Sequence, residues 1–423
     1  MKTKKWITLL SLLFMGIIRV YSQDIEYARF IVKTLTSSEY KGRGYIGKGD
    51  KKAAEFIVGQ FEKYRLQPFG KDYLQKYSFS INTFPEKMEV VVDDRKLMSG
   101  KDYVISLASK GVKASYELEW LIDDSIPESS RWKELCSIDL THKLVVTDEF
   151  HKNLVEVNLL GAAGYVFLKD SNEIISWKVS NGRILKNFLV MDIQKEKLGK
   201  TTQRISVEFK NKYEENYQTQ NVIGMIRGLG SPDTFLVISA HYDHLGMMGE
   251  KTMYPGANDN ASGVGMMLDL ARHFSLPGNE PYYSLVFIAF SGEEAGLMGS
   301  NYYAEHPLFP LAQIKFLINL DMIGSGSEGI GVVNGQHLKK AGLLLQQLND
   351  KGKYLSEVAL RGESKNSDHF PFYNKGVSCF FIYTMGKEWP YYHTPEDTCC
   401  PPFTAYIGLF DLLNEFIVKV RFL

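Results

Sequence analysis

The feature that most constrains the fold lies downstream of residue 221, where short apolar runs alternate with segments of helical periodicity. The apolar runs contain almost no polar side chains, which is typical of strands buried on both faces of a sheet. The expected strands are residues 221–226, 234–240, 284–290, 314–320 and 377–383, and the expected helices are residues 263–274, 296–306, 337–350 and 403–420. Because strands separated by helices usually pair in parallel, the chain is predicted to be an α/β protein whose mostly parallel sheet carries helices on both faces.

The region between residues 86 and 212 differs, because short alternating runs are separated there by turn-forming residues. That pattern is typical of β-rich structure, and the region holds no cluster of His, Cys and carboxylate residues. We therefore predict a β-rich inserted domain at residues 86–212, which divides one larger domain into residues 23–85 and 213–423. The polar run at residues 210–220 is predicted to be a boundary connection or an exposed link between strands.

The N-terminus has the layout of a secretory signal peptide. Three lysines precede an apolar run at residues 6–18, and small or tolerated residues follow up to Ser22. The run is too short to span a bilayer comfortably, although an uncleaved anchor is the alternative. We expect residues 1–22 to be removed, the protein to be exported to the periplasm or the extracellular space, and no stable membrane insertion after cleavage.

Composition excludes some partners and narrows the use of cysteine. Lys plus Arg equals Asp plus Glu at 49 each in 423 residues, so bulk charge does not indicate a nucleic acid partner. Four cysteines in so long a chain do not form a disulfide scaffold. Cys379 lies in an apolar run and is expected in the core, whereas the pair Cys399-Cys400 could be bonded elsewhere or stay reduced.

The candidate functional residues follow the ends of the expected strands. In an open α/β sheet, ligands collect beyond the carboxyl ends of the strands. His241 and Asp243 follow the strand 234–240, Asp259 precedes a helix, Glu293 and Glu294 follow 284–290, Asp321 follows 314–320, and His393 comes after 377–383. We therefore expect two imidazoles and several carboxylates to converge at one edge of the sheet.

Each of these residues has a structural explanation when it is taken alone. A histidine at a strand end is commonly a hydrogen-bonded structural residue, Asp259 can cap the following helix, and paired glutamates usually face solvent. Taken together, the convergent charges have a desolvation cost unless a cation compensates. His, Asp and Glu side chains suit zinc, although other divalent ions can bind such a site.

Five ordered motifs carry a resemblance to a known family. They are His-Tyr-Asp-His, Gly-Ala-Asn-Asp-Asn-Ala-Ser-Gly, Ser-Gly-Glu-Glu-Ala-Gly-Leu-Met-Gly-Ser, Asn-Leu-Asp-Met-Ile-Gly and Tyr-His-Thr-Pro-Glu-Asp-Thr. Together they resemble the signature of the bacterial two-zinc aminopeptidases, of the leucyl aminopeptidase and aminopeptidase S type, whose family also includes glutamate carboxypeptidase II. The resemblance covers residues 24–84 and 221–423. Residues 143–168 are similar, more weakly, to the protease-associated domain often inserted in this family.

The resemblance implies a role for each motif residue. It implies two zinc ions per chain, with Asp259 bridging them, His241 and Asp321 on one ion, and Glu294 and His393 on the other. Glu293 matches the general base, and Asp243 matches the carboxylate that orients the His241 ring. Asp368 and His369 match a segment that borders the site, where they either contact it or only form a turn. His244 has no role in the pattern, and the oxyanion donor stays open among Tyr383, Tyr391 and Tyr392.

The resemblance implies an exported metallo-aminopeptidase that removes N-terminal residues from peptide substrates by means of a metal-activated water. A glutaminyl cyclase, which shares the fold but uses one zinc, is the alternative enzyme class. Carboxypeptidase action on acidic peptides would need basic residues in the specificity pocket. A binding protein on a peptidase scaffold, as in the transferrin receptor, should have lost ligands, whereas the expected set is complete here.

Overall fold

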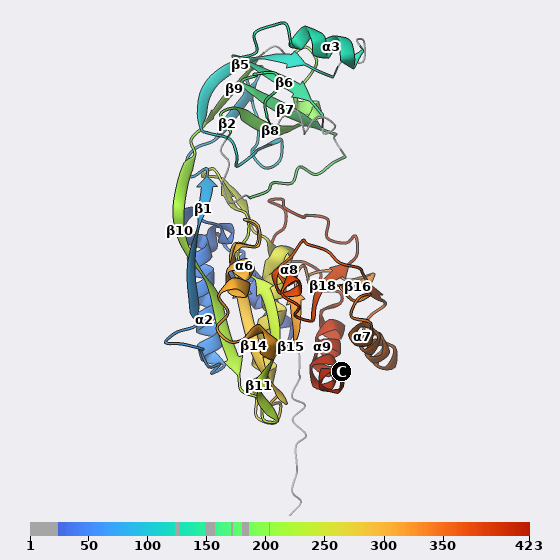
Figure 1. Ribbon diagram of the computed structural model, residues 1–423. Coiled ribbons are helices and arrows are strands. Elements are labelled where there is room, and N and C mark those ends of the chain that lie inside the picture. The colour runs from blue at the N-terminus through green and yellow to red at the C-terminus, as the bar shows by residue number, and fades with distance from the viewer. Residues whose placement is uncertain (1–23, 123–126, 149–156, 171, 180–185, 203) are drawn as a thin grey trace, which may run out of the picture.

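The computed structural model describes residues 24–122, 127–148, 157–170, 172–179, 186–202 and 204–423; the expected signal peptide lies outside these ranges. Within them, eight strands form the first sheet in the order β1-β10-β14-β11-β15-β18-β16-β17. These strands are β1 (Leu74–Thr83), β10 (Lys212–Ile226), β14 (Tyr283–Phe290), β11 (Ser231–His241), β15 (Ile314–Leu320), β18 (Cys379–Met385), β16 (Gly329–Val333) and β17 (Val358–Leu360). Figure 1 shows this sheet in the lower half of the molecule.

The centre of the first sheet is parallel, as the apolar runs predict. β14, β11, β15 and β18 pair in parallel, with Val237 opposite both Val286 and Leu317. The outer strands make the sheet mixed, because β10 pairs antiparallel with β14, and β16 pairs antiparallel with β18. The α/β class is therefore confirmed, and the parallel arrangement holds for the four central strands.

Helices cover both faces of the first sheet (Figure 1). One face packs against α1 (Ile25–Leu35), α2 (Gly49–Lys63), α5 (Gly263–Phe274), α7 (Lys339–Gly352) and α9 (Tyr406–Lys419). The other face packs against the shorter α6 (Met298–Glu305) and α8 (His369–Asn374), through Tyr303 and Phe372. Cys379 is fully buried in this second layer, as its apolar surroundings predict.

The polar run at residues 210–220 is a strand rather than only a connection. Residues 212–226 form β10, whose first half pairs antiparallel with β1, so that Leu74 lies opposite Val222 and Thr83 opposite Lys212. Several side chains in this half are exposed, so the strand needs few apolar residues. The prediction was wrong here because few residues of this run are apolar, whereas the strand is defined by its backbone pairing with β1 and buries only part of its first half.

A second sheet is formed by strands between residues 89 and 209. Its order within the described residues is β3-β2-β9-β5-β6-β7-β8-β4. The strands are β2 (Glu89–Val92), β3 (Arg95–Lys96), β4 (Tyr103–Ile105), β5 (Val112–Trp120), β6 (Lys143–Thr147), β7 (Gly164–Lys169), β8 (Leu189–Gln194) and β9 (Arg204–Phe209), with α3 (Glu128–Leu135) against them. Partly exposed ion pairs such as Lys143–Glu119 connect its surface residues. β1 and β10 extend from the first sheet towards this second one (Figure 1).

Among the described residues, no helix combines the length and the apolar character needed to cross a membrane.

Candidate metal centre

The residues expected at the strand ends lie at one edge of the first sheet. β14, β11 and β15 are neighbouring parallel strands, so their carboxyl ends meet there. In chain order, His241 ends β11, Asp259 lies in the helical turn Ala257–Ser262 before α5, Glu293 and Glu294 follow β14, Asp321 follows β15, and His393 lies in the loop after β18. The structure therefore brings all five expected metal ligands and Glu293 to the same place.

His241, Asp259 and Asp321 form the first compact group. Nε2 of His241 lies 3.3 Å from Oδ1 of Asp259 and 3.4 Å from Oδ1 of Asp321. Two ligands bound to one tetrahedral zinc ion are separated by about 3.3–3.5 Å, because each zinc–ligand bond is about 2.0–2.2 Å long. The three donor atoms are thus spaced as ligands of one metal ion would be, and the imidazole is buried.

Asp259 also belongs to a second group, with Glu294 and His393. Nε2 of His393 lies 3.1 Å from Oδ2 of Asp259 and 3.2 Å from Oε2 of Glu294. The two oxygens of Asp259 therefore face two different imidazoles. A carboxylate placed in this way can hold two metal ions, one on each oxygen.

The second oxygen of Asp321 is held by a chain of hydrogen bonds. The Ser367 hydroxyl donates to Oδ2 of Asp321 over 2.7 Å, and it accepts from the side-chain amide of Asn319 over 2.8 Å. Ser239 in turn donates to the amide oxygen of Asn319 over 2.8 Å. Because Oδ2 is occupied, Oδ1 is the oxygen left to face His241.

Asp259 is held through its backbone. The carboxylate of Asp397 accepts hydrogen bonds from the backbone N–H groups of Asn258 and Asp259, and from Nε1 of Trp389. On the other side, the fully buried guanidinium of Arg43 donates to backbone carbonyls that include Gly256 and Asp259. Burial lowers the pKa of Arg43 to about 10, so it remains a cation at neutral pH.

Asp243 contacts both His241 and Glu293. The resemblance implies that its carboxylate orients His241, but in the structure its backbone carbonyl is the nearer group. Its backbone carbonyl lies 3.2 Å from Nδ1 of His241, whereas its carboxylate Oδ1 is 3.8 Å away. The carboxylate instead accepts hydrogen bonds from the backbone N–H of Glu293 and from the hydroxyl of Tyr45, both over 3.1 Å. The carbonyl orients the imidazole, and the carboxylate fixes the backbone of Glu293.

His244 takes part in this site, although the sequence motifs give it no role. Its Nδ1 lies 2.7 Å from Oε1 of Glu294, and the ring is fully buried. A separation of 2.7 Å is a hydrogen-bond distance and is too short for two ligands of one metal ion. We therefore interpret His244 as the partner that occupies Oε1 and leaves Oε2 for His393. The sequence signal was the spacing of His241 and His244 directly after a buried strand.

The site strongly favours positive charge. Burial lowers the pKa of His393, but Glu294 and Asp259 more than compensate and raise it to about 10. Burial likewise opposes ionisation of Glu294, yet His393 and His244 hold its pKa at about 2. The pKa of Asp259 is held well below its usual range by His241 and His393, against the effect of burial. Protons on His241 and His393 supply the positive charge that a metal ion would supply after displacing them.

The remaining carboxylates at this edge behave differently. Burial raises the pKa of Glu293, and the charges of Glu294, Asp368 and Asp321 raise it further. Burial also raises the pKa of Asp368 to about 7, and both Asp368 and His369 are fully buried. Glu293 is partly exposed and lies in neither group of candidate metal ligands, which leaves its carboxylate available for a proton or a substrate.

These observations fit a zinc centre. Imidazole nitrogens and carboxylate oxygens are the ligands that zinc takes in hydrolytic sites. The first group has the spacing of tetrahedral ligands, and the second group, at 3.1 and 3.2 Å, is slightly closer. The hydrogen bonds from Ser367 and His244 occupy the carboxylate oxygens that do not face an imidazole, which is how proteins orient metal-bound carboxylates.

Comparison with solved structures supports the same fold. The zinc aminopeptidase BSAP from Bacillus subtilis superposes with a TM-score of 0.70 at 20% identity, and the alignment covers 94% of each chain. A peptidase M28 precursor from Shewanella amazonensis SB2B superposes with a TM-score of 0.71 at 16% identity, again over 94% of each chain. At these identities the likeness shows that the architecture, including both sheets, is shared.

Sequence comparison finds relatives for part of the chain. Aminopeptidase YwaD of Bacillus subtilis (strain 168) is 33% identical over 230 residues, which is 49% of this chain and 46% of the relative. A probable zinc metalloprotease of Pyricularia oryzae is 39% identical over 113 residues, or 26% of this chain and 22% of the relative. The chain thus aligns with about half, or less, of these relatives. Residues 221–401, which carry all five candidate ligands, match the model of peptidase family M28. Over this segment the chain is therefore similar to peptidase family M28.

Proposed function

We propose that this chain is a zinc aminopeptidase with two metal ions. His241, Asp321 and Oδ1 of Asp259 would hold one ion, while Glu294, His393 and Oδ2 of Asp259 would hold the other. The observation that carries the proposal is the pair of donor groups that share one carboxylate. The relatives named above support the activity, since they are named as an aminopeptidase and a zinc metalloprotease.

When bound, zinc would polarise the scissile carbonyl and lower the pKa of the attacking water. Glu293 then acts as the general base, because its carboxylate takes the proton of that water and passes it to the departing amine. Its backbone N–H donates to Asp243, so Asp243 fixes the place from which Glu293 works. The carbonyl of Asp243 holds the His241 ring at Nδ1 and leaves Nε2 free for metal.

A peptide with a free N-terminus is the proposed substrate. The name of one relative, an aminopeptidase, supports this substrate class.

The domain organisation and location are proposals as well. Residues 1–22 would direct export to the periplasm or extracellular space. Residues 23–85 and 213–423 would form the peptidase domain, and residues 86–212 would form an insertion of the protease-associated type. All strands of the second sheet fall within that insertion, which supports these boundaries.

Metal content together with substrate release tests the proposal. We expect two zinc ions per purified chain, release of free amino acids from chromogenic N-terminal amides, and no cyclisation of a Gln-initiated peptide. Asp259→Ala should lose both ions because Asp259 belongs to both groups. One zinc per wild-type chain together with pyroglutamate formation would instead favour a glutaminyl cyclase.

A further inference from the structure

A segment of the second-sheet region contacts the backbone of a candidate metal ligand. The backbone N–H of Trp177 donates to the carbonyl oxygen of His393 over 3.0 Å. His393 has a φ of +58°, in the left-handed region that is uncommon for non-glycine residues and disfavoured unless surrounding contacts stabilise it. The Trp177 hydrogen bond therefore stabilises an unfavourable backbone conformation at His393.

The side chain of Trp177 anchors this contact. It is 3% exposed, and its Nε1 donates to the carbonyl oxygen of Ile105 over 2.8 Å. Its ring lies 5.0 Å from that of Tyr254, in the short strand β13 (Thr252–Tyr254), which precedes the Asp259 turn. Trp177 is thus fixed both to the insertion, through Ile105, and to the peptidase side, through Tyr254.

A second loop of the insertion reaches the same place independently. Gly100 has a φ of +79°, and a Cβ atom there would lie 2.8 Å from Cγ of Pro395 and 2.6 Å from Cγ2 of Thr252. Pro395 is only two residues beyond His393. Two separate parts of residues 86–212 therefore pack against the loop that carries this ligand.

The loop also connects His393 to Asp259. The Asp397 carboxylate accepts the backbone N–H groups of Asn258 and Asp259, and its backbone carbonyl accepts that of Ala257. A displacement of the loop would therefore shift His393 directly and Asp259 through Asp397.

We propose that Trp177 is a positioning residue through which the insertion holds the His393 loop in its metal-binding conformation. The inference rests on the proposed function only in taking His393 as a metal ligand. Loss of the Trp177 hydrogen bond lets the loop relax, so zinc at the His393 position binds more weakly. One backbone hydrogen bond contributes about 1 kcal/mol, which corresponds to a loss of about five- to tenfold in zinc affinity.

Three substitutions of Trp177 separate its backbone N–H from its ring. Trp177→Pro removes the N–H donor together with the indole, Trp177→Ala removes the indole and keeps the N–H, and Trp177→Phe keeps the N–H and an aromatic ring. Zinc dissociation constants of the full chain are measured by competition with a chromogenic chelator. We expect Trp177→Pro to weaken zinc at the His393 position about tenfold relative to Trp177→Ala, and to weaken the other ion less, because Asp259 belongs to both groups. Trp177→Phe should stay close to wild type.

A second variant guards against a folding defect in Trp177→Pro. Gly100→Ala pushes on Pro395 from the other loop and should weaken the same zinc ion. Because the positive φ and the contact with Thr252 also lower stability, circular dichroism of the zinc-free variant has to show a folded chain. Excess zinc should restore turnover in both variants. Unchanged zinc affinity in folded Trp177→Pro and Gly100→Ala would overturn the inference. His393→Ala is the reference: if it does not weaken zinc either, the proposed ligand assignment has failed instead.

Discussion

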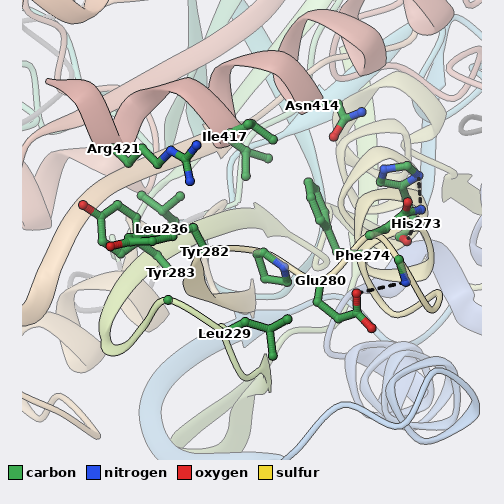
Figure 2. Close-up of a pocket in the computed structure, with 15 residues that line it drawn as sticks. Leu229, Leu236, His273, Phe274, Glu280, Tyr282, Tyr283, Asn414, Ile417 and Arg421 are labelled. Atoms are coloured by element: carbon green, nitrogen blue, oxygen red, sulfur yellow. Dashed lines mark hydrogen bonds between the residues drawn. The ribbon is translucent and has the colours of Figure 1, made fainter.

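The two ends of the first sheet differ in what they do with polar side chains. At the carboxyl ends of the strands, three buried imidazoles and several carboxylates contact one another. At the amino ends, near the starts of β11 and β14, the structure has a cavity of about 550 Å³. Figure 2 shows Arg421 and His273 on opposite sides of this cavity, with Glu280 between them.

The polar groups of the cavity are satisfied locally. Asn279 donates to Nδ1 of His273, Glu280 accepts the backbone N–H of Gly278, and Arg421 lies 5.0 Å over the ring of Tyr282. Cavity volume and buried charge thus mark opposite ends of the first sheet, and the proposed metal centre lies at the end with the buried charge.

The largest effect is expected for Glu293, whose substitution should abolish catalysis without removing metal. Glu293→Gln should lower turnover by about 10³-fold or more, since general-base catalysis contributes about 10²–10⁴-fold. Because Glu293 belongs to neither group of candidate ligands, its zinc content should remain that of wild type. Steady-state kinetics and metal analysis on one preparation check this. Near-normal turnover would remove Glu293 from its role.

Asp50 allows the loss of folding stability caused by burying a carboxylate to be measured at a position away from the candidate ligands. Burial raises its pKa from 3.8 to about 6, although Tyr217 and Thr219 donate hydrogen bonds to it. The folded pKa lies above the unfolded one, so the folded state is favoured at low pH and loses stability as pH rises from about 4 to 6. The shift corresponds to about 3 kcal/mol.

Urea unfolding of wild type and Asp50→Asn between pH 4.5 and 7.5 measures this cost. The free energy of unfolding of wild type should fall relative to the variant as pH rises, and the difference should level off above about pH 6–7. Common effects, such as metal binding, cancel in that difference. A difference that is constant with pH would mean that Asp50 titrates normally.

Substitution of His244 tests whether this imidazole acts through Glu294 rather than as a metal ligand. His244→Leu removes the hydrogen bond to Oε1 of Glu294 and should weaken zinc about 10- to 100-fold, the usual effect of losing such a partner. His244→Asn can place an N–H near the former Nδ1 and should recover most of the affinity. Zinc titration against a chelator measures both variants. Equal losses in the two would indicate that His244 binds metal directly.

The smallest effect is expected at the amino end. Arg421→Ser and Glu280→Gln change two polar groups of the cavity, neither of which contacts the metal centre. Both variants should keep kcat/KM and zinc content within about a factor of two of wild type, since surface changes of this kind have small effects. A collapse of activity in either variant would break the distinction between the two ends.

Local sequence was sufficient for elements with a strong apolar pattern. Residues 314–320 were predicted as a strand and 263–274 as a helix, and these are the bounds of β15 and α5. The candidate ligands followed from the same strands, because parallel strands bring their carboxyl ends together whatever the details of their register. That is why a site made by strands distant in sequence could be anticipated.

What sequence could not provide depends on contacts between distant segments. β16 and β17 are too short to show a period, and most side chains in the first half of β10 are polar and exposed. The hydrogen bond of His244 to Glu294 needs the relative position of two loops. The contact of Trp177 with His393 joins segments more than 200 residues apart, and no local pattern reports such a pair.

The pairing of β1 with β10 has a consequence for biosynthesis. Leu74 and Val222 lie opposite each other, and the strands of the second sheet occupy the chain between them. During synthesis, nearly 150 residues are added after Leu74 before its partner Val222 in β10 is made. Domains generally fold as units during synthesis, and non-local strand pairs form late. The second sheet can therefore mature first and shorten the distance that β1 and β10 must close.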